Sequence, residues 1–213
     1  MKIEKFTFNG FQENTYVIYD HKKNCIFIDP GCYDRQEKEM LLTFIEENNL
    51  HPKAIVNTHA HIDHVLGVQF LSKHFQIPFY LHKDDVETLK SVSNYAHLYG
   101  FGAYEPYEGE IQLLEDQKEI QFGDIQFQVF HTPGHCPGHV VFYNAEEKIV
   151  VNGDVLFKGS FGRVDLPGGD MDVLKSSIFN TLFQFPDSTK VYCGHGPETT
   201  IGQEKTSNYI LQF

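Results

Sequence analysis

Residues 58–64 read THAHIDH and place three imidazoles and one carboxylate within six positions. The run follows the apolar segment KAIVN, which we expect to form a buried strand. Alternate residues of a loop can direct His59 and His61 at one cation, while Asp63 and His64 are directed at a neighbouring point. A polar surface loop with unrelated histidines seldom carries four ligand-type side chains at this spacing. The run therefore predicts a metal site at the end of a strand.

A second histidine cluster, HTPGHCPGH, occupies residues 131–139 after the apolar run IQFQVF. Its two prolines and two glycines predict a tight, rigid loop, which is a good mount for a ligand. We expect His135, at the centre of the loop, to bind metal. His131 and His139 are interpreted as residues that support a ligand or the loop itself.

Two weaker signals follow along the chain. Asp154 directly follows the run VVNG, which begins with two apolar residues. His195 lies in the glycine-rich segment CGHGP. Taken separately, a Gly-Asp pair after a strand is usually a turn, and a Gly-His-Gly segment is usually a loop. They gain meaning only in combination with the two histidine clusters.

Composition restricts the class of protein. The chain has 213 residues, 41% of them hydrophobic, which predicts one globular domain over residues 1–213. Its formal charge is 17 minus 29, or −12, without a lysine-arginine cluster, so we expect no nucleic-acid partner. No apolar stretch is long enough for a membrane span, and the start MKIEKFTFNG lacks the apolar core of a signal peptide. We therefore expect a cytoplasmic protein without a membrane partner. The four cysteines lack CxxC spacing, so they indicate neither a thiolate zinc site nor a disulfide framework.

The hydrophobic pattern predicts strands and helices in each half of the chain. The expected helices cover Glu37–Asn48 with a stripe of Met40, Leu41, Phe44 and Ile45, a segment with Val65, Val68 and Leu71, a segment from near Lys83, and about Met171–Phe183 behind an Asp170 cap. The expected strands are KIEKFTF, TYVIYD, NCIFID, KAIVN, IPFYL, QKEIQF, IQFQVFHT, HVVFYN, KIVVNG and TKVYCG. Two sheets packed face to face with helices outside them are the simplest layering of these elements.

The four chemical elements, in this order, resemble the metallo-β-lactamase superfamily from Asp29-Pro30-Gly31 to residues 194–208 (GHGPETTIGQEKTSN). The resemblance implies an α+β, four-layer αββα fold with two mixed sheets. It also implies two divalent metal ions, zinc or alternatively iron or manganese. The implied ligands are His59, His61 and His135 for one ion, Asp63, His64 and His195 for the other, and Asp154 as the bridge, with Asp63 and Asp154 as the catalytic carboxylates.

Several residues point to one branch of that superfamily. His61 stands where flavodiiron oxygen reductases carry Glu, and Asp154 stands where several true β-lactamases carry Cys or Ser, which disfavours antibiotic hydrolysis. The short spacing from His135 to His195 leaves little room for the inserted domain of RNA-processing members. The run GDVLFKGSFGRVDLPGGD, followed by GHGPETTIG, is similar to short bacterial glyoxalase II-like proteins. The resemblance implies a small-molecule thioester substrate such as S-lactoylglutathione, attacked by a metal-bridging hydroxide.

A few residues outside the ligand set bear on how the substrate and the metal loop are held. Larger glyoxalase II enzymes hold glutathione partly with a C-terminal helical extension, whereas this chain ends eighteen residues after His195. Arg163 and Lys158 could meet a substrate carboxylate, or Arg163 could pair with Asp165 to hold a loop. Asp29, by resemblance, supports the metal loop through hydrogen bonds; a simple Asx turn is the alternative.

Two other functions fit the same motifs. A persulfide dioxygenase also resembles this chain but uses one iron at His59, His135 and Asp154 and consumes oxygen. A non-catalytic metal-binding module is the third interpretation, and the complete ligand set counts against it. Metal identity and oxygen uptake distinguish the first two.

Overall fold

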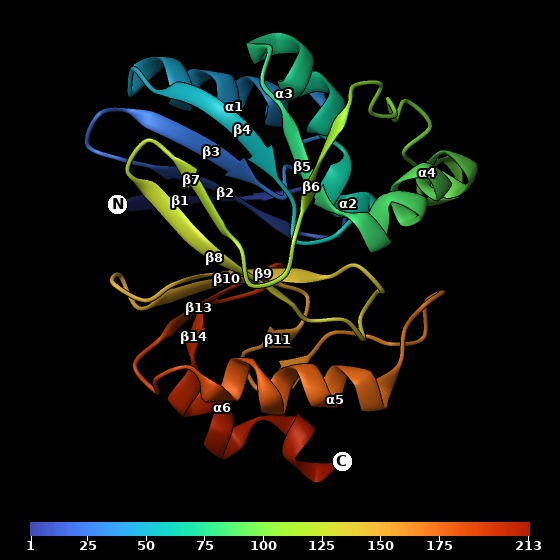
Figure 1. Cartoon of the computed structure of the whole chain (residues 1–213). Coiled ribbons are helices and arrows are strands. Elements are labelled where there is room, and N and C mark those ends of the chain that lie inside the picture. The colour runs from blue at the N-terminus through green and yellow to red at the C-terminus, as the bar shows by residue number, and fades with distance from the viewer.

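Two six-stranded sheets lie face to face in the computed structural model, which describes residues 1–213 (Figure 1). Helices cover the outer side of each sheet, so Figure 1 shows the layers helix, sheet, sheet and helix from top to bottom. This is the αββα layering expected from the sequence. No helix combines the length and hydropathy that crossing a membrane requires.

The first sheet has the strand order β1-β2-β3-β4-β5-β6. The strands are β1 (Lys2–Phe8), β2 (Glu13–Tyr19), β3 (Asn24–Ile28), β4 (His51–Val56), β5 (Phe79–His82) and β6 (Ile111–Leu114). The first three are antiparallel, and β3 to β6 are parallel to one another. The carboxyl ends of β3, β4 and β5 therefore meet at one edge of the sheet, where ligand-binding residues of α/β sheets usually lie.

The second sheet has the strand order β14-β13-β10-β9-β8-β7. The strands are β7 (Glu119–Phe122), β8 (Ile125–His131), β9 (Val140–Asn144), β10 (Ile149–Gly153), β13 (Lys190–Cys193) and β14 (Thr199–Thr200). Both β8 and β10 run antiparallel to β9, and β13 runs parallel to β10. The carboxyl ends of β8, β10 and β13 thus also share an edge. A small hairpin of β11 (Leu156–Phe157) and β12 (Ser160–Phe161) follows β10.

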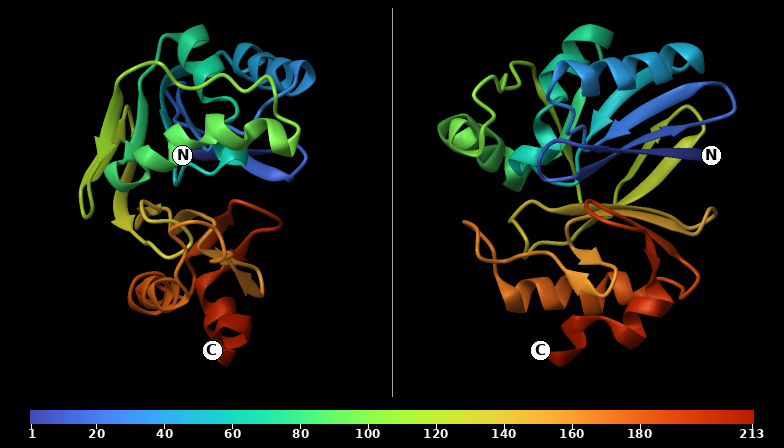
Figure 2. Two further views of the ribbon diagram at one scale, coloured as in Figure 1. Left: turned by 90° about the vertical axis from the view of Figure 1, so that its right-hand side faces the viewer. Right: turned by 180° about the vertical axis from the view of Figure 1, so that it is seen from behind.

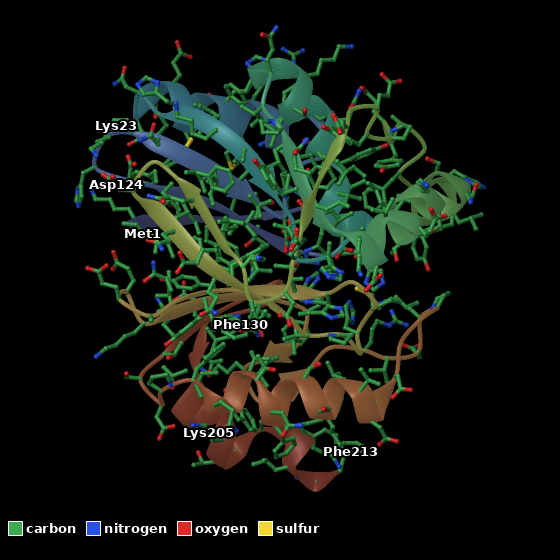
Figure 3. All side chains as sticks on the ribbon, in the orientation of Figure 1. Met1, Lys23, Asp124, Phe130, Lys205 and Phe213 are labelled. Carbon is green, nitrogen blue, oxygen red and sulfur yellow. The ribbon has the colours of Figure 1, made fainter.

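The helices flank the sheets. The α-helices are α1 (Arg35–Glu47), α2 (Ile62–Val65), α3 (Val68–Phe75), α4 (Val86–Tyr95), α5 (Met171–Asn180) and α6 (Ile201–Ser207). Short 3-10 turns are η1 (Lys83–Asp85), η2 (Ala96–Tyr99), η3 (Leu182–Gln184) and η4 (Tyr209–Gln212). The two views of Figure 2 place α5, α6 and the C-terminus below the second sheet, while the N-terminus belongs to the first sheet. Figure 3 correspondingly shows Phe213 at the foot of the molecule and Met1 near its middle.

Three apolar clusters hold these layers together. Leu41 of α1 and Phe79 of β5 belong to the cluster between the first sheet and its helices. Tyr16 of β2 and Phe142 of β9 belong to the cluster between the two sheets. Leu174 of α5 belongs to the third cluster, beneath the second sheet. Burial of apolar surface on both faces of each sheet is what fixes the four-layer arrangement.

Capping side chains mark where α1 and α5 begin. The Asp34 side chain accepts a hydrogen bond from the Glu37 backbone, and the Glu37 side chain reciprocates in a capping box. Asp170 caps α5 by accepting from the Val173 backbone, as the sequence predicts. The expected stripe of α1 is only partly correct, because Leu41 is buried but Met40 is 49% exposed.

Two helix predictions are wrong in detail. The single helix expected after the histidine run divides into α2 and α3 at Gly67, whose backbone N–H bonds to the Pro30 carbonyl at 2.8 Å. A Cβ on Gly67 would lie 2.5 Å from the Cys32 sulfur, so the chain passes too close to another loop for a larger residue. The helix expected to reach Phe183 ends at Asn180 and continues as a 3-10 turn.

Candidate metal centre

All seven predicted ligands lie at the shared edge of the two sheets. The THAHIDH run follows β4, and its last residues form α2, which marks this edge in Figure 1. The second sheet contributes His135 after β8, Asp154 after β10 and His195 after β13. The parallel relation of β8, β10 and β13 explains why residues so far apart in sequence are neighbours here.

The first group of possible ligands is His59, His61 and His135, whose nearest ligand atoms all lie within 4.8 Å of one another. The His61 Nδ1 and His135 Nε2 atoms are 2.8 Å apart. His59 Nε2 is buried and has no hydrogen-bond partner. A buried nitrogen without a partner is costly in a folded protein, and a bound cation would remove that cost.

The second group is Asp63, His64 and His195, again with ligand atoms within 4.8 Å of one another. His195 Nε2 lies 3.1 Å from the Asp63 carboxylate. His64 Nε2 is buried without a hydrogen-bond partner, as is His59 Nε2 in the first group. Each group therefore contains one buried Nε2 atom that lacks a hydrogen-bond partner.

The Asp154 carboxylate lies between the two groups. Its Oδ1 is 3.6 Å from His64 Nε2, and its Oδ2 is 3.7 Å from His135 Nε2 and 3.5 Å from His195 Nε2. Oδ1 is buried and has no hydrogen-bond partner. Imidazole nitrogens and carboxylate oxygens in this number suit divalent cations such as zinc, iron or manganese. The residues present thus fit resident divalent metal.

Three of the ligand-type histidines are each oriented by a contact at their Nδ1 atom. His135 Nδ1 donates to the Arg163 carbonyl at 2.7 Å, and His195 Nδ1 donates to the Phe11 carbonyl at 3.1 Å. His64 Nδ1 lies 3.2 Å from Asp29 Oδ2. These acceptors hold each ring through Nδ1, so that each Nε2 is the atom aimed at the centre.

Asp29 also holds the start of the histidine run. Its Oδ1 accepts from the Thr58 backbone at 2.7 Å, and its Oδ2 accepts from the Thr58 hydroxyl at 2.5 Å. The supporting role predicted for Asp29 is therefore confirmed, in preference to a simple turn. Its φ of 50° is a conformation that Asp tolerates better than most residues.

Asp85 is a supporting residue that the sequence did not indicate. Its buried carboxylate accepts from the Ala60 backbone at 2.5 Å and the Gly138 backbone at 3.4 Å, so it joins the two histidine loops. It also accepts from the Thr88 hydroxyl at 3.0 Å and lies 3.6 Å from the Cys136 sulfur. In the sequence it is one acidic residue at the start of a helix, and its partners lie up to 53 positions away.

The two remaining histidines of the second loop differ from His135. His139 is fully buried, accepts from the Asp154 backbone through Nε2 at 3.0 Å, and packs on His59 with ring centroids 4.7 Å apart. His131 donates through Nε2 to the Pro137 carbonyl at 2.8 Å. Neither shares a group with His135, in line with the expectation that they support the loop.

Glycines give the ligands room. A Cβ on Gly194 would lie 2.1 Å from Asp154 Oδ1 and 2.9 Å from His64 Cε1. A Cβ on Gly162 would overlap the Asp154 carbonyl. Gly153 has a φ of 51°, which turns the chain sharply between β10 and Asp154. The glycines beside the weak Asp154 and His195 signals are thus part of the site.

The electrostatics of the centre favour neutral His59 and His61, a charged His64, and ionised Asp63 and Asp154. Burial lowers the pKa of His61 to about 3 and lowers the pKa of His59 well below its usual value. Burial opposes charge on His64 as well, but the Asp63 and Asp154 carboxylates raise the pKa of His64 well above its usual value. In the metal-free protein a proton on His64 therefore offsets part of the carboxylate charge.

His195 has aromatic residues near it, Phe157 beside its ring and Phe11 at its Nδ1 atom through the backbone carbonyl. Phe11 is 42% exposed and packs near Tyr99, with ring centroids 5.8 Å apart, while Phe157 lies 6.1 Å from the His195 ring. Arg163 forms two hydrogen bonds to Asp165, at 2.7 and 2.8 Å. The alternative in which Arg163 holds a loop is thereby confirmed. No sequence pattern marked Phe11, which precedes the nearest ligand by 48 positions.

Comparisons with known proteins agree with this geometry. The profile of the Metallo-beta-lactamase superfamily matches residues 8–195. Hydroxyacylglutathione hydrolase GloC of Haemophilus influenzae is 36% identical over 212 residues, covering 99% of this chain and 98% of its own. The crystal structure of BLEG-1 B3 metallo-beta-lactamase is 38% identical with a TM-score of 0.88, and each chain is covered completely. The crystal structure of TTHA1623 in a di-iron-bound form is 39% identical with a TM-score of 0.86, covering 97% of this chain and 98% of its own. The chain therefore belongs to the metallo-beta-lactamase superfamily and is a metal-dependent hydrolase.

Proposed function

We propose that this hydrolase holds two divalent cations and cleaves a thioester of the hydroxyacylglutathione kind. The observation that carries the proposal is the position of Asp154, whose carboxylate approaches His135 of one ligand group and both His64 and His195 of the other. A carboxylate so placed can bind both cations and offset their mutual repulsion. The name of the relative GloC supports the substrate class.

The proposed ligand assignment follows the two groups. One cation is held by His59, His61 and His135, and the other by Asp63, His64 and His195, with Asp154 shared. The buried Nε2 atoms of His59 and His64 and the Oδ1 atom of Asp154 would gain their missing partners. Zinc is our first choice of metal, and the di-iron form of TTHA1623 supports iron as the alternative.

The chain itself supplies positioning and charge for the reaction. Two divalent cations, when bound, activate a water molecule near neutral pH and polarise the substrate carbonyl. His135 and His195 are held to backbone carbonyls, so their Nε2 atoms stay aimed at the reacting region. Asp63 and Asp154 keep negative charge there. The departing thiolate, with a pKa near 8.5, needs little help from an acid.

The surroundings of His195 suit the uncharged part of the substrate. Phe157 offers apolar surface beside the proposed ligand, and Phe11, whose carbonyl bonds to His195, packs near Tyr99. The Arg163 guanidinium is engaged by Asp165, so this cation is not free to bind a glutathione carboxylate while that pair persists. A comparison of S-lactoylglutathione with small neutral acyl thioesters therefore tests how much the glutathione moiety contributes.

A second candidate function is β-lactam hydrolysis. The support is the B3 metallo-beta-lactamase BLEG-1, which is 38% identical over the whole chain. A site that positions water against a thioester carbonyl can in the same way position water against the amide carbonyl of a β-lactam ring. We place it second because Asp154 stands where several true β-lactamases carry Cys or Ser. A chromogenic cephalosporin belongs in the same substrate panel.

Metal analysis combined with this substrate panel tests the proposal. Metal-free protein should regain thioesterase activity on addition of zinc or manganese, with about two equivalents bound per chain. His195→Ala should lower the rate by about 10²–10³-fold, as loss of a group that stabilises developing charge does. His21→Ala, an exposed histidine in the turn after β2, is the matched control and should be unchanged.

If the protein is instead a persulfide dioxygenase, the expected effect of removing His195 is the opposite. A single iron at His59, His135 and Asp154 leaves His195 without a ligand role, so its removal would change the rate little. Oxygen uptake with a persulfide substrate at one iron per chain, together with no thioesterase activity in zinc, would overturn the proposal.

A further inference from the structure

A further group of side chains that could hold a metal ion lies outside the centre described above. It consists of His82, Asp84 and His131, whose nearest ligand atoms all lie within 4.8 Å of one another. His82 ends β5 in the first sheet, Asp84 lies in the following turn η1, and His131 ends β8 in the second sheet. The group therefore connects the two sheets, separately from the proposed ligands.

The two imidazole rings are already in contact. Their centroids are 4.3 Å apart, and their planes differ by 18°. The Pro137 carbonyl can only accept a hydrogen bond, so His131 Nε2 carries the proton and His131 Nδ1 keeps a lone pair. His82 Nδ1 accepts one long bond, 3.4 Å from the Asp84 backbone nitrogen, so this nitrogen is unprotonated, and a metal ion would replace that bond. Each ring thus has one nitrogen able to bind a metal.

Carboxylates supply opposite charge at this position. Asp84 Oδ2 lies 3.7 Å from His82 Nδ1. Asp116 accepts from the His131 backbone at 2.8 Å and acts electrostatically on His82, and Lys83 is the one cation that opposes them. Burial and the neighbouring His131 lower the pKa of His82, so its ring is neutral and available to a metal at neutral pH.

We propose that His82, Asp84 and His131 form a peripheral binding site for one divalent transition-metal ion, with zinc and copper as the cations that best suit two imidazoles and a carboxylate. Ligand nitrogens point at a metal in the plane of their ring, so the stacked pair must open. His131 makes the movement, because it is partly exposed whereas His82 is 4% exposed.

Such an ion would tie the end of β5 to the end of β8. Asp85, which joins the two histidine loops of the main centre, is the next residue after Asp84. An ion bound at the peripheral site would therefore restrain the segment that carries Asp85. The inference concerns binding alone and does not depend on which reaction the main centre performs.

Zinc titration of the metal-loaded protein against a chromophoric chelator tests the proposal. Wild-type protein should bind one equivalent more per chain than His131→Ala, and Asp84→Ala should lose the same equivalent. Asp84 is an exposed side chain on a turn, so its variant tests the site even where His131→Ala alters the loop. His21→Ala should retain the wild-type number. Equal stoichiometry in all four proteins would overturn the site.

Nuclear magnetic resonance of the ring nitrogens gives a second readout. Addition of zinc to metal-loaded protein should shift one ring nitrogen each of His82 and His131 to the range of a metal-bound imidazole. Unchanged signals from both residues at zinc saturation would refute the assignment, including the case in which extra zinc binds elsewhere. Because stoichiometries are compared between variants, the result does not depend on how many ions the main centre holds.

Discussion

Replacement of Asp85 by Ala tests whether a residue that touches no proposed ligand side chain controls the metal centre. Its carboxylate connects Ala60, between His59 and His61, with Gly138 in the loop that carries His135. Removal of the carboxylate leaves these buried backbone N–H groups without their acceptor. Both histidine loops should then move independently.

The structure allows an estimate of the cost. The bonds from Ala60 at 2.5 Å and Thr88 at 3.0 Å are the two strong ones, and a bond to a charged group contributes about 1.5–3 kcal/mol. Burial opposes this gain, because it raises the pKa of Asp85 and disfavours the ionised form. We therefore expect the free energy of unfolding to fall by about 2–4 kcal/mol. For a chain of this size the melting temperature should drop by about 5–15 °C.

Metal affinity is the more specific readout. Loss of a residue that orients ligands typically weakens metal binding by about 10–100-fold. Thermal unfolding of the metal-free protein and competition with a chelator separate the two effects. Glu87→Ala is the control, because Glu87 lies on α4 with its side chain 84% exposed and should change stability by less than about 0.5 kcal/mol. Wild-type metal affinity in Asp85→Ala would refute the role of Asp85 as a link between the loops.

Three further predictions concern the proposed ligands. Asp154→Ala should empty both metal positions whereas His195→Ala should empty mainly one, and metal analysis that finds two tightly held ions in Asp154→Ala would contradict the bridging role. Gly194→Ala should abolish activity and lower metal content, since its Cβ would lie 2.1 Å from Asp154 Oδ1, while Gly102→Ala, with nothing within 4 Å, should behave as wild type. Because nearby carboxylates raise the pKa of His64, a proton occupies its ring near neutral pH and must leave when metal binds. Metal affinity should therefore fall as the pH falls, and metal addition at pH 7 should release protons into a weakly buffered solution; an absence of released protons would contradict this.

Much of the fold could be predicted because its elements have clear local patterns. The capped helices α1 and α5 have periodic apolar residues, and the central strands are continuous apolar runs. The four-layer form itself came from the family resemblance rather than from periodicity. Short elements such as β6, β11, β12, β14 and α6 were not predicted, since two to seven residues carry too little pattern to distinguish them from loops.

The candidate ligands could be predicted for a similar reason, because histidines and aspartates after strands are visible in the sequence. Asp85 and Phe11 could not, since their roles depend on chain segments brought together only by folding. The Phe11 contribution is its backbone carbonyl, which any residue type has, so no sequence pattern marks it. Met40 illustrates the other limit, because helical spacing cannot tell the edge of an apolar stripe from its centre.

The order of the ligands along the chain explains why both sheets are needed. Each proposed cation takes two ligands from the first half of the chain and one from the second, with Asp154 shared. Contacts between the two halves of the chain exist without metal: the Tyr16 hydroxyl of β2 donates to the Cys193 carbonyl at 2.6 Å, and the Asn14 side chain donates to the Cys193 and Gly196 carbonyls. These bonds fix the His195 loop against β2 before any ion arrives. The spacing of the ligands is therefore set by the packing of one sheet on the other, and a cation completes a site whose geometry the protein has already established.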